Sequence, residues 1–234
     1  MKALILAAGF GVRLREMIHG RPKPMAPIAG KPFLEHLINN LKKKGVKDIV
    51  LAVGYLSDYI VDYFGDGKNL RVNIAYSIDN RPLGTAGTIK YAQSFFNEDF
   101  LVLNGDTFID LDFFDFLKYH QEKKADVTIA VAKKFQGRGG LIVLNKDKTV
   151  KEFKEIIGHQ KGKGYNNAGA YIFKPSVLKF LKKGERASLE KDLFPLLIEK
   201  KYKLVGYPIK DYLDIGSPES YKKAIQVLKR MEGK

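Results

Sequence analysis

The first apolar run of the chain leads into a segment, residues 4–37, that combines small residues, glycines and cations. Gly9 and Gly11 allow backbone N–H groups to approach and converge on an anion. Arg13 adds a planar fork of donors that matches phosphate oxygens, and Lys23 adds a point charge in a stretch that its two neighbouring prolines keep extended. These residue types and spacings predict a loop that cradles a triphosphate. The plainer alternative is a flexible turn with incidental cations.

Two common phosphate-binding patterns do not fit this segment. The dinucleotide fingerprint requires a third glycine at the position that Leu14 occupies. The P-loop requires serine or threonine directly after its Gly-Lys pair, whereas Gly30 and Lys31 are followed by Pro32. Neither of these two schemes applies to the chain.

Two aspartates stand where a metal ion could join the triphosphate. Asp106 follows the apolar run 100–104 through one glycine, so we expect its carboxylate at the carboxyl edge of the sheet, beside the phosphate loop. Asp214 also ends a short strand and precedes a glycine and a helix. Magnesium prefers one or two protein carboxylates together with phosphate oxygens and water, so this pair predicts Mg²⁺ as the cofactor. The alternatives are a turn-forming role for Asp106 and a helix cap for Asp214.

Composition excludes several classes of protein. The 234 residues contain no cysteine, which excludes disulfides, thiolate metal sites and cysteine nucleophiles. The net charge of +15 suggests an anionic partner, but the lysines are spread over expected helix ends and no basic run is interleaved with exposed aromatic residues. We therefore expect no nucleic-acid partner. The histidines lack the spacing of metal ligands; they are His19, His36, His120 and His159.

The length of the apolar runs and the pattern of the N-terminus indicate where the protein is located. The runs have the length of strands rather than of membrane spans, and the N-terminus has no signal-peptide pattern. We expect a cytoplasmic protein with no membrane partner.

The elements that must position these residues alternate along the first half of the chain. Apolar runs of strand length, beginning with 2–8, are separated by segments of about 10 to 15 residues with helical periodicity, such as 31–45. This alternation predicts an α/β fold, a doubly wound, mostly parallel, Rossmann-like sheet with helices on both faces. After residue 132 the pattern changes to paired strands with a polar turn, which predicts a small antiparallel extension. We expect one domain with three parts, which are 1–132, 133–215 and a C-terminal helix over 216–234.

The phosphate loop also carries a resemblance. "LAAGFGVRL" followed by "RPKPMAPIAGKP" is similar to the signature of the sugar-1-phosphate nucleotidylyltransferases, Gly-x-Gly-x-Arg-Leu and then Pro-Lys. "PKPMAPIAGKPFLE" with "SLEKDLFP" most resembles the branch of guanylyltransferases that act on D-glycero-D-manno-heptose 1-phosphate. Five further segments match the family in order and spacing: 82–90, 103–108, 167–173, 188–195 and 212–221.

This resemblance implies an enzyme that condenses a nucleoside triphosphate with a sugar 1-phosphate, using magnesium, as a monomer or homo-oligomer, in a chain without the additional C-terminal domain of some relatives. It implies that Arg13 grips the β and γ phosphates, that Lys23 lies against the α-phosphate, and that Asp106 and Asp214 bind the metal. Arg13, Lys23 and Asp106 would be the catalytic residues. The implied nucleotide-binding residues are Leu6, Ala8, Gly9, Gly11, Arg13, Lys23, Asp79, Pro82, Gly84, Thr85 and Asp106. For Gly84 and Thr85 the alternative is tight packing at a helix start.

The implied sugar site departs from the family at one position. Relatives commonly have lysine directly after the carboxylate that Glu155 matches, and here Ile156 stands there. Another cation would then bind the sugar phosphate, and the candidates are Lys154, Lys161 and Lys163. The implied sugar-phosphate residues are Gly140, Glu155, Asn167 and Gly169.

Other functions remain open at this stage. Within the reaction, mannose 1-phosphate with GTP, glucose 1-phosphate with dTTP or UTP, and MurNAc 1-phosphate with UTP are alternatives. A metal-dependent glycosyltransferase would use an Asp-x-Asp pair, which Asp110 and Asp112 match, although Asp112 also suits the cap of the next helix. A catalytically silent nucleotide-sugar sensor should lack Arg13, Lys23, Asp106 or Asp214, and all four are present.

Overall fold

The computed structural model describes residues 1–9, 18, 20–79, 81–133, 139–156 and 163–232. Its helices are η2 (Lys23–Met25), α1 (Phe33–Lys43), α2 (Ser57–Phe64), η3 (Lys68–Leu70), α3 (Gly84–Tyr91), η4 (Ala92–Phe95), α4 (Phe113–Glu122), η5 (Pro175–Phe180), η6 (Leu189–Leu193), α5 (Phe194–Glu199) and α6 (Pro218–Glu232). Its strands are β1 (Lys2–Leu6), β2 (Pro27–Ile28), β3 (Lys31–Pro32), β4 (Asp48–Val53), β5 (Asn73–Ile78), β6 (Phe100–Asn104), β7 (Thr107–Phe108), β8 (Val127–Lys133), β9 (Gly139–Leu144), β10 (Val150–Ile156), β11 (Tyr165–Phe173), β12 (Leu204–Ile209) and β13 (Leu213–Asp214).

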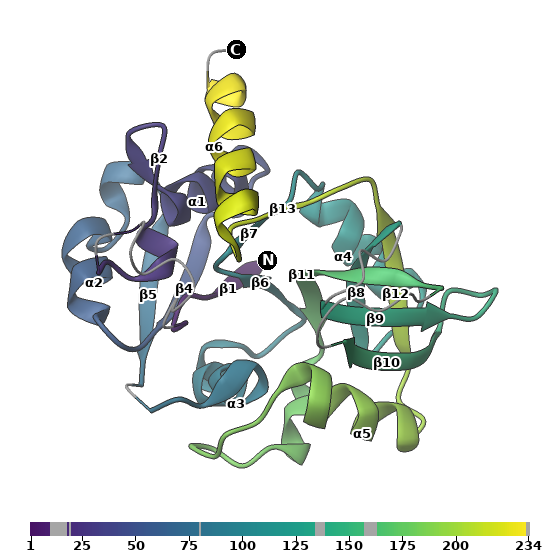
Figure 1. Ribbon diagram of the computed structural model, residues 1–234. Coiled ribbons are helices and arrows are strands. Elements are labelled where there is room, and N and C mark those ends of the chain that lie inside the picture. Colours follow the sequence, from purple (N-terminus) through teal and green to yellow (C-terminus); the bar gives the residue numbers. More distant parts are fainter. Residues whose placement is uncertain (10–17, 19, 80, 134–138, 157–162, 233–234) are drawn as a thin grey trace.

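Four parallel strands form the core of the main sheet. They lie in the order β5, β4, β1, β6, with β1 between β4 and β6 (Figure 1). Each strand is followed by a helix or a turn that begins at the same edge of the sheet, as parallel pairing requires. The predicted α/β fold is therefore confirmed, and the carboxyl ends of β1 and β6 lie next to each other.

The predicted antiparallel extension is also present. β11 runs antiparallel to β6 and continues the sheet, and it pairs further along its length with β8 and β9. β10 pairs with β9 in an antiparallel hairpin, and β12 runs parallel to β8. Figure 1 shows these strands as one half of the molecule, beside the parallel core.

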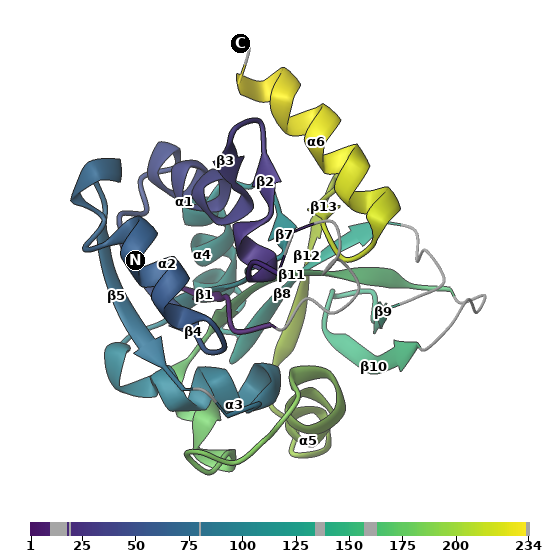
Figure 2. The ribbon, with the colours of Figure 1, turned by 60° about the vertical axis from the view of Figure 1, so that its left-hand side comes forward.

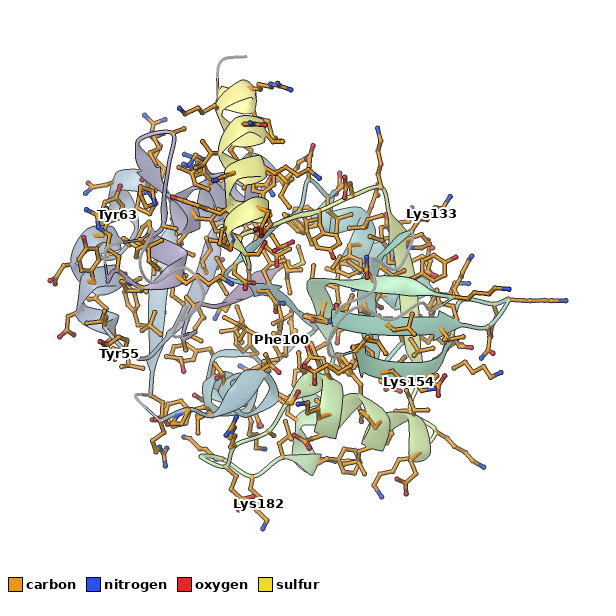
Figure 3. All side chains as sticks on the ribbon, in the orientation of Figure 1. Tyr55, Tyr63, Phe100, Lys133, Lys154 and Lys182 are labelled. Carbon is orange, nitrogen blue, oxygen red and sulfur yellow. The ribbon has the colours of Figure 1, made fainter. Side chains whose placement is uncertain are left out.

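Helices cover both faces of the sheet, because successive side chains of a buried strand point to opposite faces. Ala3 and Ile5 of β1 belong to the core cluster that also contains residues of α1, α2, α4 and α6. Leu4 belongs to the second cluster, with residues of α3, η6 and α5. Phe100 packs within this second cluster, near the middle of the molecule in Figure 3, and stacks on Phe96 with ring centroids 4.2 Å apart. None of the described helices is both long and apolar enough to cross a membrane.

One helix of the second half takes a tight form. Pro175–Phe180 forms the 3₁₀ helix η5. The apolar pairs Val177/Leu178 and Phe180/Leu181 repeat every three residues and all pack on the second cluster. A 3₁₀ helix has three residues per turn and aligns such pairs on one side.

Candidate active site

A cavity of about 370 Å³ opens at the carboxyl ends of β1 and β6. The predicted residues Gly11 and Arg13 lie outside the described part of the chain. Eight other residues of the predicted nucleotide site line the cavity: Leu6, Ala8, Gly9, Lys23, Pro82, Gly84, Thr85 and Asp106. Six residues that were not predicted for the nucleotide site complete the described lining: Pro24, Leu83, Thr88, Asn104, Gly105 and Arg186.

Gly105 explains how Asp106 reaches the cavity. Its N–H donates to the carbonyl of Leu6 at 3.0 Å, so the turn after β6 crosses directly over the end of β1. A Cβ at this position would lie 2.6 Å from the same carbonyl oxygen. Only glycine permits this close approach, which brings Asp106 to the end of β1, the strand before the predicted phosphate loop.

The ammonium of Lys23 lies against the carboxylate of Asp106. Nζ of Lys23 is 2.5 Å from Oδ2 of Asp106, and the lysine side chain is only 15% exposed. Lys23 begins the short helix η2, whose Pro24 and Met25 are buried, so packing fixes the backbone that carries the cation. Because its position is already fixed, this cation can bind an incoming anion without first being reoriented.

Asp214 is brought to the same edge by the small antiparallel pair β7–β13. In this pair Asp214 lies opposite Thr107, the residue after Asp106, and the N–H of Ile215 donates to the carbonyl of Asp106 at 3.0 Å. Oδ1 of Asp214 accepts hydrogen bonds from the N–H of Gly216 at 2.8 Å and from the hydroxyl of Ser220 at 2.9 Å. The two predicted metal ligands are therefore neighbours across a strand pair, although more than a hundred residues separate them in the sequence.

Lys23 also faces this second carboxylate. A Cβ added to Gly216 would lie 2.9 Å from Oδ1 of Asp214 and 3.9 Å from Nζ of Lys23. The described residues contain no cluster of three or more carboxylates or histidines that would enclose a metal. Two neighbouring carboxylates fit magnesium, which takes the rest of its coordination from phosphate oxygens and water.

The opposite wall of the cavity is the start of α3. Gly84 has φ +70°, and a Cβ there would lie 2.5 Å from the carbonyl oxygen of Ala187. A Cβ at Gly87 would lie 2.5 Å from the carbonyl oxygen of Glu185. The hydroxyl of Thr85 donates to Glu190 at 3.2 Å. Gly84 and Thr85 thus line the cavity, and the two glycines allow the segment 185–190 to pack against the helix start.

Asp79 takes a different position from the other predicted nucleotide residues. It is not among the residues that line the cavity, and the guanidinium of Arg81 donates to both oxygens of its carboxylate, with the shortest contact, to Oδ2, at 2.6 Å. This hydrogen bonding, more than the neighbouring positive charge, lowers the pKa of Asp79 below its usual range.

The predicted sugar residues converge on the extension. Glu155 of β10 lies opposite Gly140 of β9, and a Cβ on Gly140 would lie 2.9 Å from Cβ of Asn167. Gly169 has φ +72°, and a Cβ there would lie 2.7 Å from Nδ2 of Asn104, which lines the cavity. The predicted sugar residues therefore adjoin the cavity, and Asn104 is the lining residue that Gly169 meets.

Lys191 is the cation that the structure places beside Glu155. Its Nζ lies 3.1 Å from Oε2 of Glu155. Lys154, a candidate from the sequence, pairs instead with Glu152 at 2.7 Å and alternates with Glu155 along the strand, so the two side chains start on opposite faces. Lys163 is exposed, and Lys161 lies outside the described residues. No spacing rule pointed to Lys191, because it comes from η6 and not from the strand.

A family model described as nucleotidyl transferase matches residues 2–230. The chain belongs to the nucleotidyl transferase family. Its expected fold and class of reaction are those of this family.

Individual relatives agree with this membership. The D-glycero-alpha-D-manno-heptose 1-phosphate guanylyltransferase of Aneurinibacillus thermoaerophilus is 37% identical, with 96% of each chain covered. The UTP–glucose-1-phosphate uridylyltransferase of Synechocystis sp. is 36% identical over 97% of this chain and 63% of its own length. Among solved structures, HddC from Yersinia pseudotuberculosis complexed with GMP-PN superimposes with a TM-score of 0.83 at 31% identity, covering 97% of this chain and 99% of that one.

The Asp-x-Asp pair of the rival glycosyltransferase interpretation is structural in this nucleotidyl transferase. Oδ1 of Asp112 accepts hydrogen bonds from the N–H groups of Phe114 and Asp115, so it caps α4. Asp110 pairs with Lys44 at 3.0 Å. The capping alternative for Asp112 is therefore confirmed.

Two histidines are also engaged away from the cavity. Nε2 of His36 lies 2.9 Å from the carbonyl oxygen of Ile28, and Nδ1 of His120 lies 2.8 Å from the hydroxyl of Thr128. Both side chains are buried. His19 and His159 lie outside the described residues.

Proposed function

We propose that this nucleotidyl transferase condenses GTP with D-glycero-D-manno-heptose 1-phosphate to give the GDP-sugar and pyrophosphate. The observation that carries the reaction is the meeting of Lys23, Asp106 and Asp214 at the edge of the cavity. The choice of GTP and heptose is supported by the relative named as a heptose 1-phosphate guanylyltransferase, which matches this chain over nearly its full length.

The chemistry requires positioning rather than a general base. The second pKa of a phosphate monoester is about 6, so the attacking oxygen of the sugar phosphate is already ionised at neutral pH. That oxygen forms a bond to the α-phosphorus of GTP, and the bond from the α-phosphorus to the pyrophosphate oxygen breaks. The site must therefore hold two anions together and stabilise the charge on the phosphoryl oxygens.

The chain's own cations and carboxylates divide this work. Lys23 contacts the α-phosphate, and Arg13 holds the β and γ phosphates that leave as pyrophosphate. Asp106 and Asp214 hold Mg²⁺, which when bound neutralises phosphate charge and fixes the orientation of the triphosphate. The pairing of Lys23 with Asp106 keeps the ammonium at this edge before the substrate arrives.

The second substrate lies over the extension. Glu155 accepts hydrogen bonds from sugar hydroxyls, Asn167 and Gly169 contact the sugar, and Gly140 leaves room for it. Lys191 supplies the positive charge for the sugar phosphate that Ile156 cannot supply. In this arrangement 1–132 binds the nucleotide, 133–215 binds the sugar phosphate and 216–234 supports Asp214. The enzyme works in the cytoplasm as a monomer or homo-oligomer.

Other substrate pairs of the same reaction form the second candidate. The uridylyltransferase of Synechocystis sp. favours UTP with glucose 1-phosphate, since it is 36% identical to this chain. Both candidates use the same carboxylates and cations and differ in the base and sugar contacts alone.

The test is pyrophosphate release over a grid of substrates. GTP, UTP, dTTP, CTP and ATP are each combined with heptose, mannose, glucose and MurNAc 1-phosphates, with Mg²⁺ or with EDTA. We expect release with GTP and the heptose phosphate, dependent on Mg²⁺ and on both substrates. Release with UTP and glucose 1-phosphate in place of that pair would favour the second candidate, and no release with any pair would refute the reaction.

A further inference from the structure

The two oxygens of the Asp214 carboxylate have different surroundings. Oδ1 accepts hydrogen bonds from the N–H of Gly216 at 2.8 Å and from the hydroxyl of Ser220 at 2.9 Å. None of the residues that the structure describes donates a hydrogen bond to Oδ2. Two donors on one oxygen restrict the rotation of the carboxylate, so the second oxygen keeps its direction and stays available to a ligand.

We propose that Ser220 is a positioning residue of the magnesium site, which holds Oδ1 of Asp214 so that Oδ2 is the oxygen that binds the metal. This inference rests on the proposed function, in which Asp214 is a metal ligand. It adds to that function the residue that orients the ligand and the single carboxylate oxygen that coordinates. In this role Ser220 acts through Asp214 and contacts neither the metal nor a substrate.

The capping pattern at the start of α6 explains how Ser220 can donate to Asp214. The N–H of Ser220 donates to Oγ of Ser217 at 3.2 Å, and the N–H and the hydroxyl of Ser217 donate to Oγ of Ser220 at 3.0 and 3.2 Å. This reciprocal arrangement is a capping box, in which the third helical position usually carries glutamate or glutamine. A glutamate there would have no hydrogen to donate and would add negative charge beside Asp214. A serine hydroxyl accepts from Ser217 and still has a hydrogen for the carboxylate.

The single hydrogen of the Ser220 hydroxyl has two acceptors within reach. Besides Oδ1 of Asp214 at 2.9 Å, the carbonyl oxygen of Ser217 lies 3.1 Å from Oγ of Ser220. That carbonyl already accepts the N–H of Tyr221 at 2.9 Å, in a regular helical hydrogen bond. The carboxylate is closer and charged, and hydrogen bonds to ionised groups are stronger than those between neutral groups. The hydrogen therefore points to Asp214.

The start of α6 is also fixed relative to the segment that carries Lys23. The side chain of Tyr221 is buried, and its hydroxyl donates to the carbonyl of Pro27, the first residue of β2, at 2.6 Å. In Figures 1 and 2, α6 starts beside β13, which contains Asp214, and extends from there away from the main sheet. The first turn of α6 thus joins the chain near Lys23 to Asp214, and the hydroxyl of Ser220 comes from a rigid support.

Coordination through one carboxylate oxygen suits magnesium. This ion demands a nearly ideal octahedral arrangement and keeps several waters, whereas calcium accepts flexible geometry and carboxylates that bind through both oxygens. A carboxylate whose Oδ1 is already occupied by two donors offers one oxygen. Removal of a group that orients a metal ligand typically weakens metal binding about tenfold to a hundredfold. We therefore expect a loss of this size when the Ser220 hydroxyl is removed.

The experiment measures the binding of GTP by isothermal titration calorimetry without a sugar phosphate, once in Mg²⁺ and once in EDTA. The ratio of the two dissociation constants reports the contribution of the metal and does not depend on turnover. The proteins are the wild type, Ser220→Ala, Ser220→Thr, Asp214→Asn, the double variant Asp214→Asn with Ser220→Ala, and the control Ser217→Ala. The control removes the N-cap side chain and leaves the hydroxyl of Ser220.

We expect Mg²⁺ to tighten the binding of GTP by the wild type. Ser220→Ala should reduce this effect on the order of tenfold, while its dissociation constant in EDTA stays close to that of the wild type. Ser220→Thr, which keeps a hydroxyl, and Ser217→Ala should keep most of the effect. Adding Ser220→Ala to Asp214→Asn should cause no further loss, because Ser220 acts through Asp214.

The proposal is overturned if Ser220→Ala keeps the wild-type effect of Mg²⁺, or if it weakens binding equally in Mg²⁺ and in EDTA, which would indicate a role in folding alone. A further loss in the double variant would also overturn it. If Asp214→Asn loses the effect and Ser220→Ala keeps it, this inference fails and the proposed function stands. No effect of Mg²⁺ in the wild type, or an undiminished one in Asp214→Asn, would refute the metal ligand itself and the inference with it.

Discussion

Nζ of Lys23 and Oδ2 of Asp106 lie 2.5 Å apart, although 83 positions separate the two residues in the sequence. Asp106 follows β6, and Lys23 begins η2, the first described helix after β1. β1 and β6 are neighbours in the sheet, which helps to bring the two residues to the same edge. The contact joins one proposed metal ligand to the cation proposed for the α-phosphate. The opposite charges of Lys23 and Asp106 are therefore central to the proposed site, and substitutions that remove either charge test the proposal directly.

Asp106→Asn should reduce kcat on the order of a hundredfold or more, because the amide neither carries the negative charge that magnesium needs nor pairs ionically with Lys23. The side chain is 38% exposed, so we expect the thermal unfolding midpoint to change little. Steady-state pyrophosphate release and a thermal melt measure both. Asp110→Asn is the matched control, since Asp110 pairs with Lys44 on a different surface. Nearly unchanged kcat in Asp106→Asn would contradict the mechanism.

Gly84→Ala should destabilise the protein by about 2 kcal/mol or more, because it combines an unfavourable positive φ with a clash against Ala187. It should also weaken nucleotide binding, since the clash acts at the start of α3, which lines the cavity. Gly30→Ala separates the two effects: Gly30 also has a positive φ, +82°, but a Cβ there would meet no atom within 4 Å. Urea denaturation measures both variants. Equal losses of stability would show that backbone conformation, and not packing on residues 185–187, explains this glycine.

Lys191→Met should raise the KM for the sugar phosphate on the order of tenfold and leave the KM for GTP almost unchanged, because it removes the cation beside Glu155. Lys154→Met is the control, since Lys154 pairs with Glu152 on the other face of β10. Initial rates with one substrate varied at a time give both constants. The assignment of Lys191 fails if the control shows the larger effect on the sugar phosphate.

His120 should make stability depend on pH in the mildly acidic range. Burial, with a smaller contribution from Lys174 and an opposing one from Asp126, lowers the pKa of His120 from 6.5 to about 4. The unfolded chain therefore binds a proton below about pH 6.5 that the folded protein does not bind until about pH 4, so stability falls as the pH falls through this window. Between about pH 7 and pH 5 this one group should cost about 2 kcal/mol.

The variant His120→Asn tests this assignment, because its amide can still hydrogen-bond to Thr128. Its free energy of unfolding, measured by urea titration at the two pH values, should fall by about 2 kcal/mol less than that of the wild type. The same pH dependence in both proteins would assign the effect to other groups.

The parts of the fold that follow a local pattern could be predicted from the sequence. The buried run 100–104 and the following "NGD" predicted β6 and the placement of Asp106, since both depend on neighbouring residues. The position of β8 between β11 and β12 could not be predicted, because strand order in the extension depends on pairing between distant segments.

The same distinction applies to the site. The glycine-rich start and the residues of "PLGTAG" carry their own signal, and most of them line the cavity. Arg186 lies outside the matched segments, and the matched segment 188–195 contains Lys191 but does not indicate that this lysine meets Glu155. Their position is set by the packing of residues 185–193 on α3 and β10, and nothing in the spacing of those residues specifies that contact.

The most direct test of the account is to identify the products of GTP, the heptose 1-phosphate and Mg²⁺ by phosphorus NMR and mass spectrometry. The account predicts GDP-heptose and pyrophosphate in equal amounts, formed only when both substrates are present and lost in Asp106→Asn. Release of inorganic phosphate, or of pyrophosphate without the sugar phosphate, would contradict nucleotidyl transfer at this site.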